Sequence, residues 1–542
     1  MAELCTVFDL FKSAAERYGA AVFLHIPAEA ASAYSDRAVD LTYGEAMDLI
    51  GEARTAYAAA GLSTGVRVGL LLDNRVDFFI HWFALNGLGV SVVPLNGEAS
   101  PEDLAYIADD SGLSFIVALP ERRELASRIV DNVTRTVPVV SAHDLASLPV
   151  IESNNGAAPS ENTECALLYT SGSTGKPKGC MLSNSYFRVM GDWYRNLGDL
   201  CTIRPGQERL LTPLPLVHMN ALATSTMCMI MTGGCIIQLD RFHPRTWWKS
   251  VATSGATIVH YLGVLPAILL NLDSEPFERD HTVRFGFGAG VNPKHHKAFE
   301  DRFGFPLIEA WSMTEVGGAA AVIANREPRH VGTCCFGKPE PFMEWRLVDD
   351  AGKDVEPGQP GELLVRRAGP DPRHGFFSGY FGMPEETEKA WAGGWFHTGD
   401  IVREGPDGSL HFVDRKKSIV RRSGENISSL EVEAVLSQIA GVQAVGVAPV
   451  PDEIRGEEVF AALVMDEKSA RDEAAAQQIV AAALESLTYY KVPGYIAFVD
   501  ALPLTASQKL QRGELKSLAK VMVDKGEAFD LRALKKRPRK AG

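Results

Sequence analysis

Apolar positions along the first hundred residues alternate between two spacings, and this alternation predicts helices and strands in turn. Residues 7–18 carry apolar side chains at helical spacing, and Thr42 stands where the cap of a second helix is expected. Short apolar runs at 66–72 and 90–95 are typical of strands, and the segment between them, 78–88, is predicted to be helical. Strands that alternate with helices indicate parallel sheets covered by helices, the α/β class.

The same alternation continues along the rest of the chain. Residues 256–263 form a strand-like run that ends in polar residues, and 285–290 form a glycine-rich strand followed by a helical segment at 294–303. A turn at 405–408 precedes a predicted strand, and residues 429–436 are predicted to be a helix. No internal repeat is found.

Length and charge narrow the classes of protein that fit this pattern. The chain has 542 residues, of which 46% are hydrophobic and 23% are charged, and this size predicts two to four domains or subdomains. The formal net charge of −14 argues against nucleic-acid binding, which needs clustered lysine and arginine. The longest apolar run, 227–239, is too short to span a membrane. With no signal peptide predicted, we expect a cytoplasmic protein.

The cysteines are scattered and predict no metal or disulfide framework. None of the eight forms a CxxC pair or a zinc-ligand spacing. We therefore expect reduced thiols in a cytosolic setting, and an incidental origin for the neighbouring pair Cys334 and Cys335.

The most informative stretch is a run of small hydroxyl residues and glycines with two lysines, from Tyr169 to Gly179, directly after an apolar strand. Glycines let backbone N–H groups approach an anion, hydroxyls add donors and lysine adds charge, which is what a triphosphate requires. The spacing differs from the Walker loop, and the alternative is a flexible surface loop. The predicted phosphate contacts are Thr170, Ser171, Gly172, Ser173, Thr174, Gly175 and Lys178.

This loop resembles the signature phosphate loop of the adenylate-forming superfamily, which includes acyl-CoA synthetases, luciferases and peptide-synthetase adenylation domains. Four further motifs follow in the order of that family. The resemblance implies a large N-terminal domain of helix-covered sheets with a small barrel-like subdomain, and a small mobile α+β domain after it. The expected divisions are the N-terminal domain, a hinge, the C-terminal domain and a basic tail, at 1–414, 415–418, 419–525 and 526–542.

A second motif, from Leu307 to Glu315, resembles the adenine and magnesium motif of the superfamily. The resemblance implies that Thr314 reaches the α-phosphate and that Glu315 holds Mg²⁺, a hard cation that prefers carboxylate and phosphate oxygens. The residues expected around the nucleotide are Gly288, Ala289, Gly290, Glu309, Ala310, Trp311 and Ser312. Trp311 and Ser312 stand where the family more often has tyrosine and glycine, and these departures are expected to alter the packing around the purine and the acyl group.

The acid-binding residues are also inferred from the resemblance. A histidine after a proline-rich strand lies beside the acyl pocket in the family, although His218 by its position alone is a core or capping histidine. Five residues are candidates for contact with the acid: His218, Asn220, Thr224, His260 and Tyr261.

The remaining motifs belong to the ribose site, the hinge and the C-terminal domain. Asp400 is expected to bind both ribose hydroxyls, and Lys509 matches the lysine of the adenylation step, although Gln508 replaces the usual glycine before it. The run 420–428 resembles that of carnitine/crotonobetaine-CoA ligases. Arg415 is expected to be a further ribose contact. The candidates for the hinge and for contact with CoA are Lys417, Arg421, Arg422, Ser423 and Gly424.

Taken together, the motifs predict an ATP-dependent acid–thiol ligase. We expect a carboxylate to form an acyl-adenylate with release of pyrophosphate, after which CoA takes the acyl group, with ATP, Mg²⁺ and CoA as cofactors or co-substrates. A small polar acid such as carnitine or crotonobetaine is one candidate substrate. The alternatives are an aromatic acid, an aromatic diacid or a fatty acid, a carrier protein as acceptor, or a regulatory protein with a degenerate nucleotide site. The family resemblance also allows a homodimer.

Overall fold

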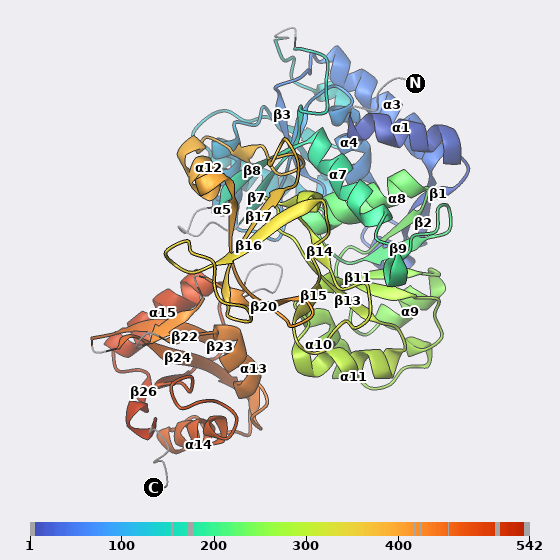
Figure 1. The fold of residues 1–542 in the computed structure, drawn as a ribbon. Coiled ribbons are helices and arrows are strands. Elements are labelled where there is room, and N and C mark those ends of the chain that lie inside the picture. Colours follow the sequence, from blue (N-terminus) through green and yellow to red (C-terminus); the bar gives the residue numbers. More distant parts are fainter. Residues whose placement is uncertain are drawn as a thin grey trace. The chain divides into compact units, whose positions relative to one another are not determined.

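The structure, a computed structural model, describes residues 6–152, 156–170, 177–416, 418–422, 425–453, 455–504 and 510–535. The chain divides into two compact units, and each is described by itself. Unit 1 comprises Met1–Trp345, Val365–His397 and Asp407–Leu410, and unit 2 comprises Arg346–Leu364, Thr398–Pro406 and His411–Gly542. The predicted α/β class is confirmed, because both large sheets of unit 1 are mainly parallel and helices lie on their faces (Figure 1).

The first large sheet has eight strands in the order β14-β13-β12-β11-β9-β10-β1-β2. Its middle strands are parallel, and the edge strands β2 and β14 are antiparallel to their neighbours. The bounds are β1 (Val22–Ile26), β2 (Val39–Thr42), β9 (Arg209–Thr212), β10 (Cys235–Gln238), β11 (Ile258–Leu262), β12 (Phe285–Ala289), β13 (Leu307–Trp311) and β14 (Val322–Ile323).

The second large sheet has seven strands in the order β18-β8-β7-β4-β3-β5-β6. The strands β4, β3, β5 and β6 are parallel, whereas β7 and β8 form an antiparallel hairpin. The bounds are β3 (Arg67–Leu71), β4 (Ser91–Pro94), β5 (Ile116–Ala118), β6 (Val139–Ser141), β7 (Glu164–Thr170), β8 (Lys178–Ser183) and β18 (Gly379–Tyr380).

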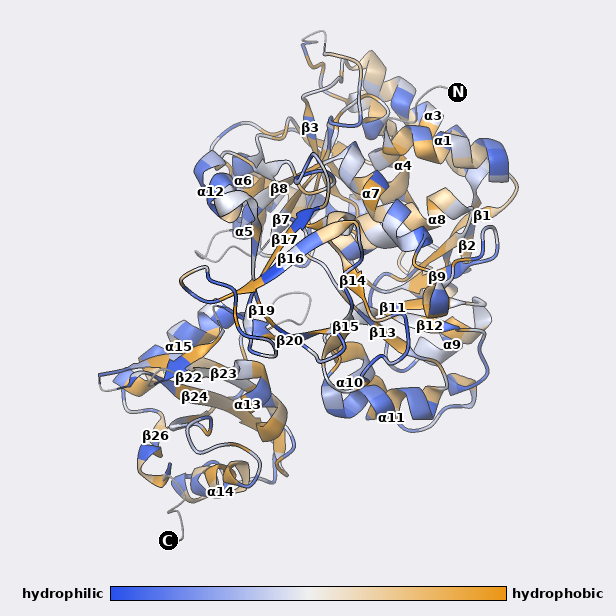
Figure 2. Cartoon of the chain, viewed as in Figure 1, coloured by the Kyte–Doolittle hydropathy of each residue, from blue (hydrophilic) through white to orange (hydrophobic). Residues whose placement is uncertain are grey.

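Helices cover these sheets, and their sequence patterns explain their positions. In α4 the residues from Phe78 to Asn86 are all buried, whereas α11 buries His296, Phe299 and Phe303 and leaves a polar face, as the mixed colours in Figure 2 show. Thr42 caps α3 through a capping box, as predicted. The bounds are α1 (Val7–Tyr18), α2 (Ala28–Ala31), α3 (Tyr43–Ala59), α4 (Val76–Asn86), α5 (Pro101–Ser111), α6 (Arg123–Asp131), α7 (Asn184–Arg195), α8 (Thr226–Thr232), α9 (Trp247–Thr253), α10 (Val264–Leu270), α11 (Pro293–Phe303) and α12 (Pro384–Ala390).

Shorter helical turns connect these elements. A π-helical segment, η4 (Asn220–Ser225), leads directly into α8. The remaining turns are of the 3-10 type: η1 (Pro120–Arg122), η2 (Leu145–Ser147), η3 (Asp199–Cys201), η5 (Pro276–Glu278), η6 (Gly317–Ala319), η7 (Ala392–Gly394) and η8 (Arg532–Leu534). No helix in the described part of the chain is both long and apolar enough to cross a membrane.

A third sheet of five strands is built from the part of the chain between Cys335 and Arg415. Its order is β15-β20-β19-β17-β16. The bounds are β15 (Cys335–Gly337), β16 (Met343–Val348), β17 (Gly361–Arg367), β19 (Phe396–Glu404) and β20 (Leu410–Arg415).

The C-terminal part of unit 2 is an α+β domain with a six-stranded sheet, in the order β22-β21-β24-β25-β26 with β23 paired to β24. Val432, Val459, Ile479 and other apolar residues form its core. The bounds are β21 (Val420–Arg422), β22 (Glu425–Ile427), α13 (Ser429–Leu436), β23 (Val442–Asp452), β24 (Gly456–Met465), α14 (Glu473–Leu484), β25 (Tyr495–Phe498), α15 (Arg512–Asp524) and β26 (Phe529–Asp530).

The structure moves two of the expected divisions. Unit 2 takes in 346–364 and 398–406, which a division by sequence order assigned to the N-terminal domain. Part of the tail expected from residue 526 is ordered structure, because β26 pairs with β25 in the C-terminal sheet. Lys535 is also buried against Glu458 of β24. Residues 526–535 therefore belong to the domain rather than to a solvated tail.

Candidate active site

Four neighbouring strands of the eight-stranded sheet bring the candidate residues to one edge. The strands β13, β12, β11 and β9 are adjacent and parallel. Because parallel strands end at the same edge of a sheet, the segments that follow them converge there, and in open α/β sheets this edge is where ligands bind. Asn220 follows β9, Gly263 follows β11, Gly290 follows β12 and Glu315 follows β13.

Glu315 is a buried carboxylate with a defined partner. Only 7% of the residue is exposed, and its Oε1 accepts a hydrogen bond of 2.9 Å from the hydroxyl of Tyr380 in β18. Burial, with the nearby Glu315 carboxylate, raises the pKa of Tyr380, so the phenol remains a donor at neutral pH. Thr314, beside it, is half-buried. Within the described part of the chain, no group of three or more His, Cys, Asp or Glu side chains is placed so that it could hold a metal ion by itself.

A buried carboxylate in the segment after a strand fits Mg²⁺, which keeps several waters and often takes its remaining ligands from substrate phosphates. The Glu315 carboxylate therefore suits a magnesium ion that arrives with a nucleotide, and Tyr380 fixes one of its two oxygens.

The base of the predicted phosphate loop is a β-hairpin. The predicted strand before the loop is confirmed as β7, and Thr170 at its end pairs with Lys178 at the start of β8. The Nζ of Lys178 lies 2.8 Å from the carboxylate of Glu386 in α12 and 5.0 Å from the centre of the Tyr380 ring. Tyr380 thus links the base of this loop to Glu315. Ser171, Gly172, Ser173, Thr174 and Gly175 lie outside the described residues.

The nucleotide candidates at the ends of β12 and β13 differ in exposure. Ala289 and Gly290 are exposed, and Gly290 has a positive φ of 76°. Gly288 is buried and packs closely against Tyr261. A side chain at position 288 would lie 2.7 Å from the ring of Tyr261. Trp311 is also buried and packs near Phe336 of β15.

Ser312 and Glu309 have hydrogen-bonding roles that the motif alone does not reveal. The hydroxyl of Ser312 donates to the carbonyl oxygen of Gly317 at 2.8 Å, which closes the turn before η6. Glu309 is 6% exposed, and its Oε1 accepts a 2.7 Å hydrogen bond from the N–H of Val291. Burial raises the pKa of Glu309 to about 7. Ala310, between them, pairs with Ile323 of β14.

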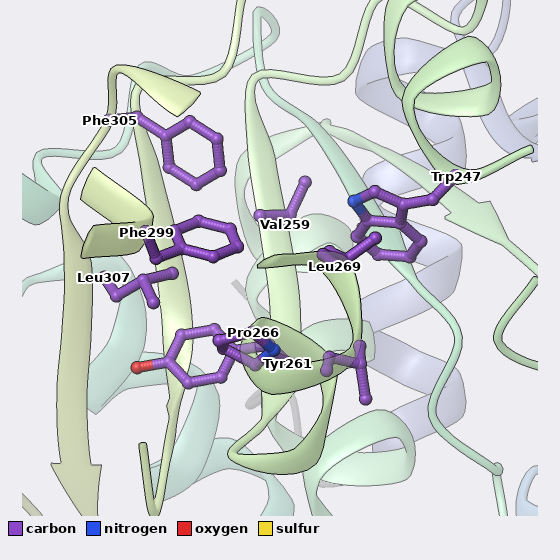
Figure 3. Close-up of a pocket in the computed structure, with 9 residues that line it drawn as sticks. Trp247, Val259, Tyr261, Pro266, Leu269, Phe299, Phe305 and Leu307 are labelled. Atoms are coloured by element: carbon purple, nitrogen blue, oxygen red, sulfur yellow. The ribbon is translucent and has the colours of Figure 1, made fainter. Parts of the chain in front are cut away.

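The acid-binding candidates His260 and Tyr261 lie on opposite faces of β11, since successive strand residues alternate. Tyr261 faces α9, α10 and α11, where its ring lines a small apolar pocket and its hydroxyl donates to the carbonyl of Ile308 (Figure 3). His260 contacts Tyr194 of α7 and Asn220 of η4 instead. The two side chains therefore cannot line one pocket, because the sheet separates them. The other residues of the apolar pocket are Trp247, Val259, Leu265, Pro266, Leu269, Phe299, Phe305 and Leu307.

The remaining acid-binding candidates lie in and just before the π-helical segment η4, which meets the His260 face of the sheet through Asn220. Asn220 is half-buried and accepts a hydrogen bond from the His260 ring, and Thr224 is buried within the same π-helical segment. His218 is half-buried in the turn before this segment, where its backbone N–H donates to the carbonyl of Pro215.

Unit 2 brings together the two predicted ribose contacts. Asp400 is 1% exposed, and its Oδ1 lies 2.7 Å from the Nε of Arg415, whose side chain is largely exposed. Arg421 is exposed and pairs with Asp350 at 3.1 Å. Arg422 is buried and both oxygens of Glu458 accept hydrogen bonds from its Nε. Lys417, Ser423, Gly424 and Lys509 lie outside the described residues.

The expectation that Arg422 contacts CoA does not fit this arrangement. A guanidinium held by a carboxylate of 0% exposure is a structural ion pair, and CoA phosphates would have to break it. Arg421 is the accessible arginine of this pair of neighbours.

Sequence reasoning missed three residues of the site: Tyr380, Glu386 and Tyr194. Each lies far along the chain from the motif residue it contacts, and none belongs to a recognisable spacing. One local signal was available for the π-helical segment. Thr224, Ser225 and Thr226 are three consecutive hydroxyl residues, and such side chains bond to nearby backbone carbonyls.

Comparison with known proteins identifies the family of the chain. The family described as AMP-binding enzyme matches residues 11–381, and that described as AMP-binding enzyme C-terminal domain matches residues 431–509. The sulfoacetate–CoA ligase of Cupriavidus necator is 31% identical over 88% of this chain and 92% of that protein. The feruloyl-CoA synthase of an Amycolatopsis species is 32% identical over 88% and 93%. The crotonobetaine/carnitine–CoA ligase of Citrobacter koseri is 26% identical over 88% and 93%.

Solved structures share the fold. The o-succinylbenzoate CoA synthetase of Bacillus subtilis, in complex with its acyl-adenylate, superposes with a TM-score of 0.78 at 24% identity, over 94% of this chain and 97% of that one. An anthranilate CoA ligase in complex with anthranoyl-AMP gives a TM-score of 0.80 at 22% identity, over 96% and 99%. The chain therefore belongs to the AMP-binding enzyme family, as an AMP-forming acid–CoA ligase.

Proposed function

We propose that this enzyme activates a small polar carboxylic acid as an acyl-adenylate and transfers the acyl group to CoA. The observation that carries this proposal is the meeting of a buried metal-binding carboxylate, Glu315, with the base of a phosphate loop through Tyr380. On the same sheet, the polar side chains of His260 and Asn220 lie on one face beside the edge where Glu315 follows its strand.

The first half-reaction needs positioning and charge neutralisation rather than a general base, because the attacking carboxylate is already ionised. One carboxylate oxygen attacks the α-phosphorus of ATP, and pyrophosphate leaves with the electrons of the broken P–O bond. Thr314 is assigned to the α-phosphate, the loop from Thr170 to Lys178 to the outer phosphates, and Glu315 to Mg²⁺, which would neutralise phosphate charge. Lys509 supplies the remaining positive charge. Asp400 and Arg415, paired at 2.7 Å, are assigned to the ribose.

In the second half-reaction the CoA thiol attacks the acyl carbon, and AMP leaves as the thioester forms. By its resemblance to the family, the C-terminal domain turns about the hinge at Lys417. This motion exchanges Lys509 for the glycine loop at Gly424. Arg421, which is exposed, is the arginine that we assign to CoA phosphates. We no longer assign Arg422 to CoA.

The names of the relatives specify different acid substrates: sulfoacetate, crotonobetaine or carnitine, and ferulate. Buried polar groups at His260 and Asn220 favour an acid with a polar group beyond its carboxylate over a purely aliphatic one, because a polar wall left unpaired by an apolar acid is unfavourable. An aromatic acid with oxygen substituents is the second candidate.

The experiment that tests the proposal is carboxylate-dependent exchange of pyrophosphate into ATP, without CoA. The acids to compare are betaines, sulfonated and hydroxylated short acids, aromatic acids and diacids, and fatty acids. Exchange with one group establishes adenylation and the substrate class. Adding CoA or an acyl-carrier protein then identifies the acceptor. Absence of exchange with every acid, in protein that binds ATP, contradicts the proposal.

Two variants separate the half-reactions. Replacing Lys509 by alanine is expected to lower the exchange rate by about a hundredfold or more, because one well-placed charge is worth on the order of 3 kcal/mol. Replacing Gly424 by a bulky residue is expected to spare exchange and to slow thioester formation. Equal damage to both steps by the Gly424 variant would contradict the assignment of two conformations.

A further inference from the structure

The segment after β9 is wound more widely than an α-helix. Residues 220–225 form a π-helix, an uncommon element that is frequent at functional sites. Side-chain hydroxyls support it. Ser225 donates to the carbonyl of Asn220 at 3.1 Å, and Thr226 donates to that of Ala221 at 2.8 Å, each five residues back. The wide turn places Asn220 against the strand β11.

His260 connects this segment to α7. The ring is fully buried, with its Nε2 2.8 Å from the hydroxyl of Tyr194. Its Nδ1 lies 2.7 Å from the Oδ1 of Asn220 and 3.0 Å from the hydroxyl of Ser225. Phe287 stacks on both rings at 4.7 Å, which holds them in place. Burial lowers the pKa of His260 to about 3, so the imidazole is neutral at physiological pH.

Hydrogen-bond capacity determines where the single ring proton lies. The Tyr194 hydroxyl is fully buried, and within the described part of the chain its hydrogen-bond partner is Nε2. A buried hydroxyl that does not donate is costly, so Tyr194 donates and Nε2 accepts. The Ser225 hydroxyl also lies 3.0 Å from Nδ1, but it donates its own proton to the backbone carbonyl of Asn220 and so acts as an acceptor toward the ring. The proton of the neutral ring is therefore on Nδ1, which donates to Asn220 Oδ1 and faces the Ser225 oxygen.

This chain of donors fixes the amide of Asn220. With its oxygen held by His260, the amide nitrogen is directed away from the ring, and the structure records no bond from it to another described residue. Asn220 is half-buried, beside the edge of the sheet where the acid is expected. The amide N–H₂ group is thus a pair of oriented donors.

We infer that Tyr194 and His260 are positioning residues that hold the Asn220 amide as a hydrogen-bond donor toward the acid, so that the enzyme selects acids with an acceptor group on the acyl chain. This inference rests on the proposed function. The acceptor is a hydroxyl, ether, carbonyl or second anionic oxygen. An apolar acid of the same size leaves the donor unpaired and is disfavoured.

The test compares pairs of acids of similar size, one with an acceptor oxygen and one without, in the exchange assay. Asn220→Ala is expected to lower kcat/KM about tenfold for the acceptor-bearing acid and little for its apolar partner. Tyr194→Phe frees Nε2 to carry the proton and lets the Asn220 amide turn. In this variant kcat/KM is expected to fall less, about fivefold, and only for the acceptor-bearing acid. The double variant is expected to lose less than the product of the two, because both act through one amide.

A matched control exists in the same unit. The hydroxyl of Tyr57 contacts the buried ring of His81 at 2.7 Å, but the other ring nitrogen of His81 meets a backbone carbonyl, that of Ala142, and no asparagine. Tyr57→Phe removes an equivalent buried hydrogen bond and is expected to leave the ratio of kcat/KM for the two acids unchanged. If Tyr194→Phe also leaves the ratio of kcat/KM values unchanged, because it lowers neither value or lowers both equally, the inference is wrong.

Nitrogen NMR of labelled histidine gives a readout that is independent of activity. The wild-type His260 ring is expected to be neutral and protonated on Nδ1, and to change tautomer in Tyr194→Phe. A wild-type ring protonated on Nε2 overturns the inference even if the Tyr194 variant does not fold. If no acid supports exchange, the proposed function fails, whereas the tautomer still tests the orientation of the amide.

Discussion

At the scale of single residues, burial rather than motif membership decides how a side chain behaves. Glu309 and Glu315 lie six residues apart and both are buried, but their partners differ. Tyr380 donates to Glu315, whereas Glu309 receives a backbone N–H from Val291. That hydrogen bond only partly offsets the desolvation of Glu309, so its pKa rises to about 7.

This raised pKa makes stability depend on pH. An acid with a higher pKa in the folded state than in the unfolded state costs stability as pH rises through the interval between the two values, here from about 4.5 to about 7. Glu309→Gln keeps an acceptor for Val291 and removes the charge. The variant is expected to be more stable than the wild type at pH 8, by up to about 3 kcal/mol, and similar at pH 4.

Urea unfolding at pH 4, 6 and 8 measures this difference. Glu356→Gln, at an exposed glutamate, is the control, and its effect is expected to stay within about 0.5 kcal/mol at each pH. A Glu309→Gln variant that shows the same difference from wild type at pH 4 and pH 8 would contradict the raised pKa.

At the scale of elements, glycines show where backbone segments approach each other. A side chain at Gly263, which follows β11, would lie 1.7 Å from the carbonyl oxygen of Gly290, which follows β12. These two strand ends form part of the edge where the nucleotide and the acid are expected. The end of the glycine-rich motif 285–290 is therefore shaped partly by Gly263, the last residue of the neighbouring run 256–263.

Gly263→Ala is expected to force these two strand ends apart. We expect a loss of about 2 kcal/mol or more in stability and a fall of up to about a hundredfold in pyrophosphate exchange, because small displacements at a reacting centre are costly. Gly51→Ala is the control. Gly51 lies within α3 with open space around it, so alanine should raise stability by about 0.5–1 kcal/mol. Normal exchange by Gly263→Ala would show that this contact does not shape the site.

At the scale of the whole molecule, the C-terminal segment completes unit 2. Glu458 of β24 is fully buried and is paired with both Arg422 and Lys535. Arg532, near the same end, pairs with Asp452 at 2.8 Å. Burial lowers the pKa of Lys535 to about 8, although Glu458 opposes this change. The last described residues are thus structural.

Ending the chain after residue 525 is expected to destabilise unit 2 by about 3 kcal/mol or more, because it removes β26 and one partner of a buried carboxylate. Ending it after residue 535 is expected to change stability by less than about 0.5 kcal/mol. All eight tryptophans fall within unit 1, so their fluorescence follows that unit, and hydrogen exchange of β24 amides follows unit 2. Equal protection of β24 in both truncations would contradict a structural role for this segment.

The sequence by itself determined the class of fold and the family, and it pointed to the phosphate-loop segment and to Glu315 as candidate site residues. These features depend on local patterns: apolar residues predicted α1 and β7, and the run from Leu307 to Glu315 matches a family motif that begins in β13. Such patterns can be recognised from the sequence because each involves residues that are neighbours along the chain.

Only the tertiary structure decided which side chains share a face or a partner. It separated His260 from Tyr261 across one strand, placed Tyr380 against Glu315, and buried Arg422 beside an exposed Arg421. Each of these contacts joins residues far apart in sequence or depends on the direction in which a side chain leaves its strand. The packing of sheets and helices sets both, and local sequence does not encode them.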